Sequence, residues 1–476
     1  MWVRNGARLT QRSRPRTQRM PVRAAAAQVL EREAPPEMME DPQPDEIPAE
    51  VHERPGQAED ARIRLTQNVE RWRTWSAPTS AVELARRTFS AISSASSPRE
   101  AQLWAYCLAR SGFFAALGAG TYATVTRFQN VSSASSSSSS SSMPLDFLSS
   151  ALFRLLGESL EMYRQDIQNI RQGYYKEPWD WSESLKLQHR QIDPLYISSK
   201  IRDLYNASMY TISKRANNSP PVGSWLRSAF GPGYHRNAFH FQEDGWMSSQ
   251  SAQKYEVSTE ALFLGRQDSM HRTVLRVLGD GAPNVMCTEN QRVLELGCGT
   301  GRQHTFVRDN LPKSTSSVLL DMSPFYLQEA RDNMQYWASK RTSSGYLPTS
   351  GAGSVDFVHG AAESLPENDE SFDLVFSTYM MHEMPRSGRR EMADEVARVL
   401  KPGGYFVWCD SRTLGDRPDS DNSVDSFSNL NEPFWRTFVR ENFVQMFEDV
   451  GLKPMLKDIG SATKALLFKK PSSHSA

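Results

Sequence analysis

The sequence predicts an α/β fold with a mostly parallel sheet, preceded by a largely helical N-terminal extension. From Gln291 onward, short runs rich in β-branched and aromatic residues alternate with helical stretches, which is the pattern of βαβ units. Before that point the chain has helical periodicity, interrupted by loops rich in Pro, Asn and Gly. With 476 residues, the chain is long enough for more than one domain.

The charge distribution sets the N-terminus apart. The chain has 55 basic and 55 acidic residues, but its first thirty residues contain seven arginines and no acid. An Arg-rich start without a long apolar core resembles an organelle transit peptide, and "VRAAAA" resembles a chloroplast cleavage region. We therefore expect a transit peptide over residues 1–27 and a chloroplast location, with the mitochondrion as the alternative. A disordered basic tail is the simpler interpretation.

Without those thirty residues, 48 basic residues face 55 acidic ones. A net negative chain is a poor candidate for binding nucleic acid, because such binding depends on neutralising phosphates. The four cysteines have no zinc-binding spacing, and we expect no metal site.

The extension divides by composition. Residues 28–60 are rich in Pro and acids, which predicts a disordered acidic linker. Residues 61–130 form a predicted helical region, and 131–143 a flexible polyserine linker. A 16-residue uncharged run in the helical region is shorter than the roughly 20 residues of a bilayer span, so we expect a buried or membrane-surface helix. Residues 144–286 are interpreted as a helical extension and substrate lid.

The segment "RVLELGCGTGR" predicts a buried strand, a glycine-rich turn and the start of a helix. Strand, glycine turn and helix together cradle nucleotides. A dinucleotide-binding loop has the spacing G-x-G-x-x-G, which would need glycine at position 302, where Arg302 stands. The spacing is instead G-x-G-x-G, preceded by the acidic Glu295, and this disfavours an NAD-linked oxidoreductase.

This segment, with "SSVLLDMSP", "SFDLVFST" and "LKPGG", resembles the class I S-adenosylmethionine-dependent methyltransferases. It is most similar to the ubiquinone/menaquinone-biosynthesis branch (methyltransferase type 11). The resemblance extends from Gln291 to Lys470 and implies a domain over residues 287–470. It also implies a Rossmann-like, seven-stranded sheet with helices on both faces, S-adenosyl-L-methionine as cofactor, and a small-molecule acceptor.

The resemblance also implies where the cofactor binds. Glu295 would orient the glycine loop and the methionine end of the cofactor, and Asp321 would accept both ribose hydroxyls. Close relatives have an adenine-binding aspartate where this chain has Ala361, so backbone groups there would contact the base. The alternatives are a strand-end charge for Glu295 and a helix N-terminal residue for Asp321. The expected cofactor-binding residues are Glu295, Gly297, Cys298, Gly299, Gly301, Asp321, Met322, Ala362 and Ser377.

Candidate catalytic residues follow the fourth expected strand in "YMMHEMP". An unperturbed histidine titrates near neutral pH, which makes His382 a candidate base, and Tyr379 and Glu383 are close to it in sequence. The alternative is a histidine that packs at a strand–helix junction. Other members of the predicted site come from "YHRNAFHFQEDGWMSSQSAQKYE", whose rings form either a lid over a flat, apolar acceptor or a packing layer. These residues are Tyr234, His235, Phe239, His240, Phe241, Trp246 and Tyr255.

The leading hypothesis is a methyltransferase that acts on a small, apolar organellar metabolite such as a quinone or tetrapyrrole. The alternative is a non-catalytic S-adenosylmethionine-binding scaffold or assembly factor at an organelle membrane, which the residue at Ala361 favours. Peripheral membrane contact, the acceptor atom and the oligomeric state are left open by the sequence.

Overall fold

The structure is a computed structural model. It describes residues 54–133, 145–187, 190, 193–216, 233–236, 242, 244–347, 352–421, 424 and 432–472. The predicted transit peptide and most of the predicted polyserine linker lie outside these residues, as do Phe239, His240 and Phe241 of the predicted lid.

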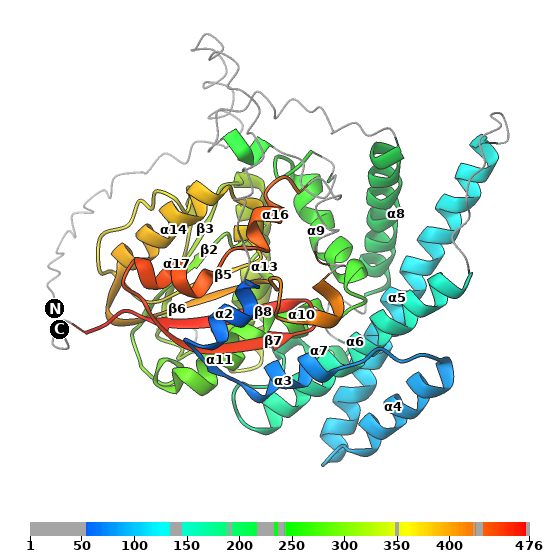
Figure 1. Ribbon diagram of the computed structural model, residues 1–476, viewed down its shortest axis with the longest axis horizontal. Helices are drawn as coiled ribbons and strands as arrows, with labels where there is room; N and C mark the ends of the chain where they lie inside the picture. The colour runs from blue at the N-terminus through cyan, green and yellow to red at the C-terminus, as the bar shows by residue number, and fades with distance from the viewer. Residues whose placement is uncertain are drawn as a thin grey trace, which may run out of the picture. The chain divides into compact units, whose positions relative to one another are not determined.

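The described chain has one eight-stranded sheet, in the order β1-β7-β8-β6-β5-β2-β3-β4 (Figure 1). Its strands are β1 (Arg64–Leu65), β2 (Arg292–Leu296), β3 (Ser316–Asp321), β4 (Val355–His359), β5 (Phe372–Thr378), β6 (Leu400–Ser411), β7 (Lys453–Gly460) and β8 (Thr463–Lys469). Only β8 runs antiparallel to its neighbours β6 and β7. The predicted α/β class is confirmed, and the carboxyl ends of β2, β3 and β5 share one edge, where ligands of such sheets bind.

Helices cover both faces of the sheet (Figure 1). They are α2 (Pro55–Asp60), α3 (Gln67–Thr74), α4 (Ala81–Ser93), α5 (Pro98–Ser133), α6 (Leu145–Arg171), α7 (Trp179–Leu185), α8 (Pro194–Ala216), α9 (Ser249–Leu262), α10 (Gln267–His271), α11 (Thr273–Gly281), α12 (Arg302–Asn310), α13 (Pro324–Ser343), α14 (Arg386–Val399), α16 (Trp435–Phe438) and α17 (Phe443–Asp449). Short 3₁₀ turns lie at Gly233–Arg236, Pro283–Met286, Met381–Glu383 and Pro418–Ser420.

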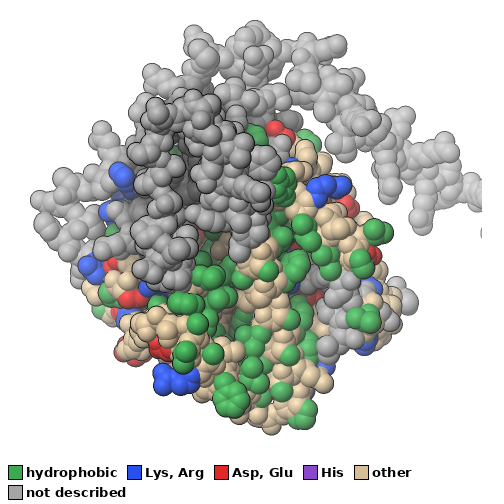
Figure 2. All heavy atoms as spheres, turned by 90° about the vertical axis from the view of Figure 1, so that its right-hand side faces the viewer, with side chains coloured by type: hydrophobic (Ala, Val, Ile, Leu, Met, Phe, Trp, Pro, Cys, Tyr) green, Lys and Arg blue, Asp and Glu red, His purple; other side chains and the backbone are tan. Residues whose placement is uncertain are grey.

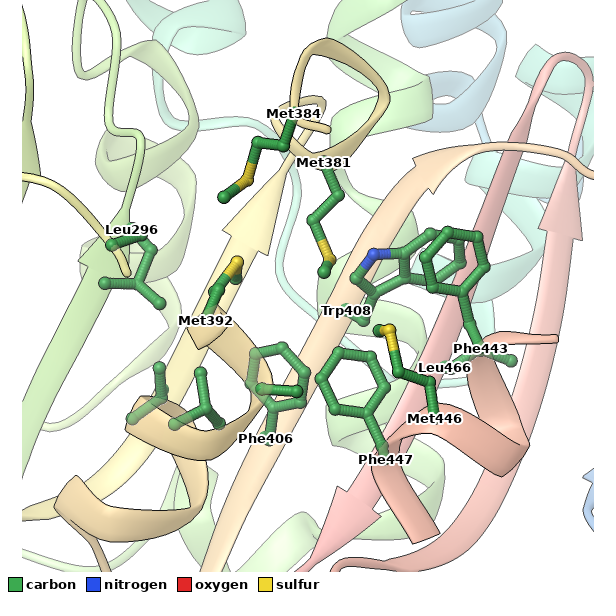
Figure 3. Packing of buried hydrophobic residues seen from close by; sticks show 14 of the residues in the cluster. Leu296, Met381, Met384, Met392, Phe406, Trp408, Phe443, Met446, Phe447 and Leu466 are labelled. Atoms are coloured by element: carbon green, nitrogen blue, oxygen red, sulfur yellow. The ribbon is translucent and has the colours of Figure 1, made fainter. Parts of the chain in front are cut away.

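The two faces of the sheet carry separate cores because successive strand residues point to opposite sides. On one face, α14, α16 and α17 pack on residues such as Phe406 and Trp408, and Figure 3 shows their rings among methionine side chains. On the other face, α11, α12 and α13 pack on Leu319, Leu374 and Phe376. Burial on both faces explains the near-continuous apolar runs of the strands.

The eighth strand, β1, lies in the region that periodicity predicts to be helical. Its two exposed residues pair in parallel with Leu456 and Lys457 of β7. A two-residue strand has no detectable alternation, so only its neighbours reveal it.

The end of the predicted linker is also ordered, because residues 55–60 form helix α2. Its Glu59 is fully buried and accepts hydrogen bonds from Lys457 Nζ at 3.1 Å and from Lys464 Nζ at 2.7 Å. Asp416 pairs with the same two lysines. The prediction of disorder is wrong for α2, since these acids are neutralised inside the fold rather than hydrated.

The helical extension packs partly on itself. Helices α4, α5, α6 and α7 share a small apolar cluster around Trp104 and Trp181. Helix α8 packs on α9, which in turn contacts α13 of the sheet domain. Across the residues that the structure describes, no helix combines the length and apolarity needed to cross a membrane.

Candidate functional site

A pocket opens at the carboxyl ends of β2, β3 and β5. The space inside it, including its open mouth, is about 970 Å³. Of the predicted cofactor-binding residues, those lining it are Glu295, Gly297, Cys298, Gly299, Asp321, Met322 and Ala362. The predicted Tyr379 lines it as well. Residues far apart in sequence therefore meet in one hollow.

Two glycines of the loop face this hollow in different ways. Gly299 has φ +54°, and a Cβ placed on it would meet no atom within 4 Å. A Cβ on Gly297, at φ +65°, would clash with Met380 Sδ. The main chain at Gly299 thus borders open space that a side chain would fill, which is the cradle expected where a ligand approaches backbone.

Gly301 has a packing role. It lies at the N-terminus of α12 and does not line the pocket, and a Cβ on it would come within 3.1 Å of Ala330 Cβ on α13. Its prediction as a cofactor contact is not supported by its position. The missing side chain lets α12 and α13 approach each other instead.

Asp321 ends β3 and lines the pocket beside the glycine loop. Its Oδ2 accepts a hydrogen bond from Gly299 N, and its Oδ1 one from Ser323 N, both at 2.8 Å. Each carboxylate oxygen has two lone pairs, so each retains acceptor capacity for one hydroxyl of a ribose. Burial raises the pKa of Asp321, although the two backbone N–H groups oppose this shift.

Glu295, inside β2, is 2% exposed, so the alternative that its charge reaches solvent is wrong. Its Oε2 lies 2.8 Å from Nδ1 of His304, which is itself completely buried. Burial, with Asp321 nearby, raises the pKa of Glu295, and burial lowers the pKa of His304. Both groups therefore favour their neutral forms, and a bound cation would shift Glu295 toward its ionised form.

At the end of β5, the residue that reaches the pocket is Thr378 rather than the predicted Ser377. Ser377 is buried in the sheet between Leu296 and Trp408, whereas Thr378 lines the pocket. Thr378 Oγ1 is buried and has no hydrogen-bond partner among the described residues. An orphaned hydroxyl at the pocket wall is a polar contact for a ligand.

Tyr379 lines the pocket, but its hydroxyl is hydrogen-bonded to Thr463 Oγ1 of β8. Burial raises the pKa of Tyr379 well above its usual value. The hydroxyl of Tyr379 therefore stays protonated at neutral pH and cannot act as a base. The residue contributes to the pocket through its ring and backbone.

His382 does not line the pocket. Its Nδ1 lies 2.7 Å from Asp410 Oδ1, and its ring packs edge-on against Trp435 and Phe438. Burial opposes protonation, but Asp410 outweighs it and raises the pKa of His382 to about 10. A histidine that is already protonated cannot act as a base at neutral pH, so the predicted catalytic role is replaced by a positioning one.

The neighbour of His382, Glu383, does line the pocket. Its Oε1 lies 3.7 Å from His382 Nε2. Burial raises the pKa of Glu383 to about 8, with His382 opposing and Asp410 reinforcing the shift. Asp410, His382 and Glu383 thus form a row of titratable groups that ends at the pocket.

The lid residues that the structure describes also reach the pocket: Tyr234, His235, Trp246 and Tyr255. Trp246 and Tyr255 form an edge-to-face cluster with Tyr326 of α13, with ring centroids 5.3–5.8 Å apart. Tyr234 hydrogen-bonds to Glu363. These rings lie against the pocket and also pack on one another, so they combine the two roles that the sequence left open.

Sequence reasoning missed His271, at the end of α10. It lines the pocket, and its ring lies 5.5 Å from the ring of Tyr379. Burial lowers the pKa of His271 to about 4. Its position on a helix ahead of the glycine loop offered no sequence signal, because folding alone brings that helix to the strand ends.

The lining residues fit the cofactor that the sequence predicts. Gly299 leaves room for a ligand at the main chain, and Asp321 retains acceptors for two hydroxyls. Four carboxyl groups, those of Glu295, Asp321, Glu363 and Glu383, line the space and would attract a cation. Among the described residues, no group of three His, Cys, Asp or Glu side chains is arranged to hold a metal ion.

The chain matches a family model described as "Methyltransferase domain" over residues 293–404. That segment begins in β2 and ends at the start of β6. It contains the glycine loop and Asp321, and therefore most of the pocket wall.

Similar proteins include the fatty-acid O-methyltransferase of Mycolicibacterium smegmatis, 29% identical over 34% of this chain and 52% of its own length. A probable phthiotriol/phenolphthiotriol dimycocerosates methyltransferase 2 of Mycobacterium ulcerans is 35% identical over 26% of this chain and 40% of its own length. A solved O-methyltransferase family protein from Burkholderia thailandensis is 15% identical, covering 57% of this chain and 73% of that one, with a TM-score of 0.39. The chain thus spans about half, or less, of these two curated relatives.

Proposed function

We propose that this chain, whose residues 293–404 match a methyltransferase domain, transfers a methyl group from S-adenosyl-L-methionine to a small, apolar acceptor. The observation that carries the proposal is the open main chain at Gly299, hydrogen-bonded through its N–H to Asp321. Main chain would contact the amino-acid end of the cofactor there, and Asp321 would accept its ribose hydroxyls.

When bound, the cofactor supplies an electrophilic methyl group on a sulfonium. The chain's own contribution is alignment, exclusion of water and removal of a proton from the acceptor. We assign the last role to Glu383, which lines the pocket, whereas His382 holds it in place and is anchored by Asp410. In its ionised form, Glu383 would take the proton that the acceptor atom loses, and the bound sulfonium would give up its S–CH3 bond and leave as a neutral thioether.

The acceptor class is supported by the aromatic lid and by two relatives whose names give a fatty acid and phthiotriol lipids as substrates. A quinone or tetrapyrrole in a chloroplast, or alternatively in a mitochondrion, is the specific hypothesis that the sequence favours. Membership of the ubiquinone/menaquinone-biosynthesis branch of methyltransferases also stays a prediction.

Three measurements test the proposal and the location. Isothermal titration with S-adenosylmethionine should give one site per chain, whereas binding of NADH in its place would refute it. Incubation with methyl-labelled cofactor and an organelle extract should label a small, organic-extractable compound. A fluorescent fusion of the full chain tests the location, and exclusion from both organelles would contradict it.

The alternative is a cofactor-binding scaffold without catalysis, which the presence of Ala361 at the adenine position favours. Titration does not distinguish it from an enzyme, but the labelling experiment does. Tight cofactor binding with no labelled product in any extract would support the scaffold.

A further inference from the structure

A second hollow adjoins the cofactor pocket and is formed by the helical extension. This outer pocket lies among α5, α8, α9 and α10 and holds about 1,200 Å³ including its mouth. It shares Tyr255, His271, Thr300 and Arg302 with the cofactor pocket. The two spaces therefore meet at the far end of the glycine loop.

The walls of the outer pocket are mostly apolar, although Lys200 and Glu256 also line them. Helix α5 contributes Phe113 and Phe114, α8 contributes Ile197 and Ile201, and α9 contributes Val257. Phe113 and Ile201 are 42% and 40% exposed, so the mouth is apolar too. Figure 2 shows hydrophobic side chains gathered on the side of the molecule where α5 and α8 lie. Exposed apolar surface is unfavourable in water, which favours an apolar occupant.

The inner end of the outer pocket is polar, and two buried side-chain atoms there have no hydrogen-bond partner among the described residues. Glu260 Oε1 accepts a hydrogen bond from Arg110 at 2.7 Å, whereas the buried Glu260 Oε2 has no partner among the described residues. His271 Nδ1 is likewise buried without a partner there. Burial raises the pKa of Glu260 to about 7, and Asp268 adds to this shift while Arg110 opposes it. Unsatisfied buried polar atoms beside a cavity indicate a ligand that completes their hydrogen bonds.

The charges at this end disfavour an anionic head group. Arg110 pairs with Glu260 and with Asp268 at 3.1 Å. Arg302 pairs with Asp180 at 2.6 Å and with Asp268 at 2.7 Å. The guanidinium groups of Arg110 and Arg302 are thus neutralised by carboxylates of the protein. A carboxylate on the ligand would therefore bring uncompensated negative charge into a buried site.

We propose that the outer pocket binds the methyl acceptor as an amphiphile, with its hydrocarbon part among α5, α8 and α9 and a neutral hydroxyl head at Glu260 and His271. This hydroxyl anchors the acceptor: it donates to Glu260 Oε2 and accepts from His271, at the junction with the cofactor pocket. It is distinct from the acceptor atom that loses its proton to Glu383 in the cofactor pocket. This assignment rests on the proposed methyl-transfer function. It narrows the acceptor to a hydroxyl-bearing lipid or phenol with an extended apolar body.

The test uses the full chain and three fluorescent probes: a pyrene-labelled long-chain alcohol, the matching carboxylate and the matching hydrocarbon. The alcohol should bind at least tenfold more tightly than either of the others, in the presence and in the absence of S-adenosylmethionine. Equal affinity for all three, or preference for the carboxylate, would overturn the head-group assignment. If S-adenosylmethionine displaces the alcohol, the alcohol binds in the cofactor pocket and the assignment of the outer pocket is wrong.

Matched variants on α8 locate the site. Ile201 lines the outer pocket, whereas Leu195, on the same helix and 81% exposed, does not. Ile201→Gln should weaken alcohol binding at least tenfold, Leu195→Gln should leave it unchanged, and both should retain wild-type cofactor affinity. Equal effects of the two substitutions would refute the site. If wild-type protein binds the alcohol but not S-adenosylmethionine, the proposed methyl-transfer function is refuted, whereas the assignment of the outer pocket as an alcohol-binding site stands.

Discussion

The open space at Gly299 makes one substitution especially informative. Gly299→Ala adds a methyl group where no protein atom lies within 4 Å, so the free protein has no clash to relieve. The cost to folding is the left-handed backbone, about 1–2 kcal/mol for a residue other than glycine. The cost to cofactor binding is separate, because the new methyl group occupies space that the ligand needs. Overpacking of this kind costs about 1–3 kcal/mol, which corresponds to a roughly 5- to 150-fold weaker Kd.

Gly451 provides the matched control. It lies in an exposed turn between α17 and β7 with φ +86°, and a Cβ there would also meet no atom within 4 Å. Urea unfolding should show similar losses of stability for Gly451→Ala and Gly299→Ala, whereas titration with S-adenosylmethionine should show weaker binding for Gly299→Ala alone. If both variants bind the cofactor as wild type does, main chain at Gly299 does not touch it and the proposed site is wrong.

Three further perturbations test other parts of the structure. Glu383→Gln should lower kcat about 10²- to 10⁴-fold and remove the rise in kcat/KM that we expect as pH increases toward about 8, measured by methyl-labelling rates; an unchanged pH profile would exclude Glu383 as the base. Asp321→Ala should weaken cofactor binding by about 1–3 kcal/mol in calorimetry, and an unaltered Kd would remove it from the ribose site. Arg417 and Arg266 overcome the effect of burial and lower the pKa of Glu158 from 4.5 to about 2, so its stabilisation is present above pH 4.5 and is lost as pH falls toward 2. Glu158→Gln should therefore remove about 3 kcal/mol of acid dependence from urea unfolding, and identical pH curves would contradict this pairing.

The glycine loop and Asp321 could be predicted because their placement is local. A buried strand, a glycine turn and a helix define the loop within a dozen residues, and the next parallel strand must end at the same edge of the sheet. The hydrogen bond from Gly299 N to Asp321 is the direct result of that arrangement.

Other parts of the site depend on information that is not local. Strand β5 is buried on both faces, so its sequence has no alternation to indicate that Thr378 rather than Ser377 faces the pocket. The orientation of His382 is set by Asp410, on the next strand of the sheet. The outer pocket is formed by four helices, α5, α8, α9 and α10, and no periodicity in the sequence identifies which helices pack on one another.

The buried cluster of α2 has a consequence for how the chain folds during synthesis. Glu59 is held by Lys464, 405 residues further along the chain, and β1 pairs with β7 rather than with any strand near it in sequence. These N-terminal residues leave the ribosome long before the β7–β8 hairpin exists, so Glu59 stays hydrated until the last strands emerge. Completion of the sheet edge is therefore a late event, and a chain truncated before Lys457 lacks both lysines that hold Glu59 of α2.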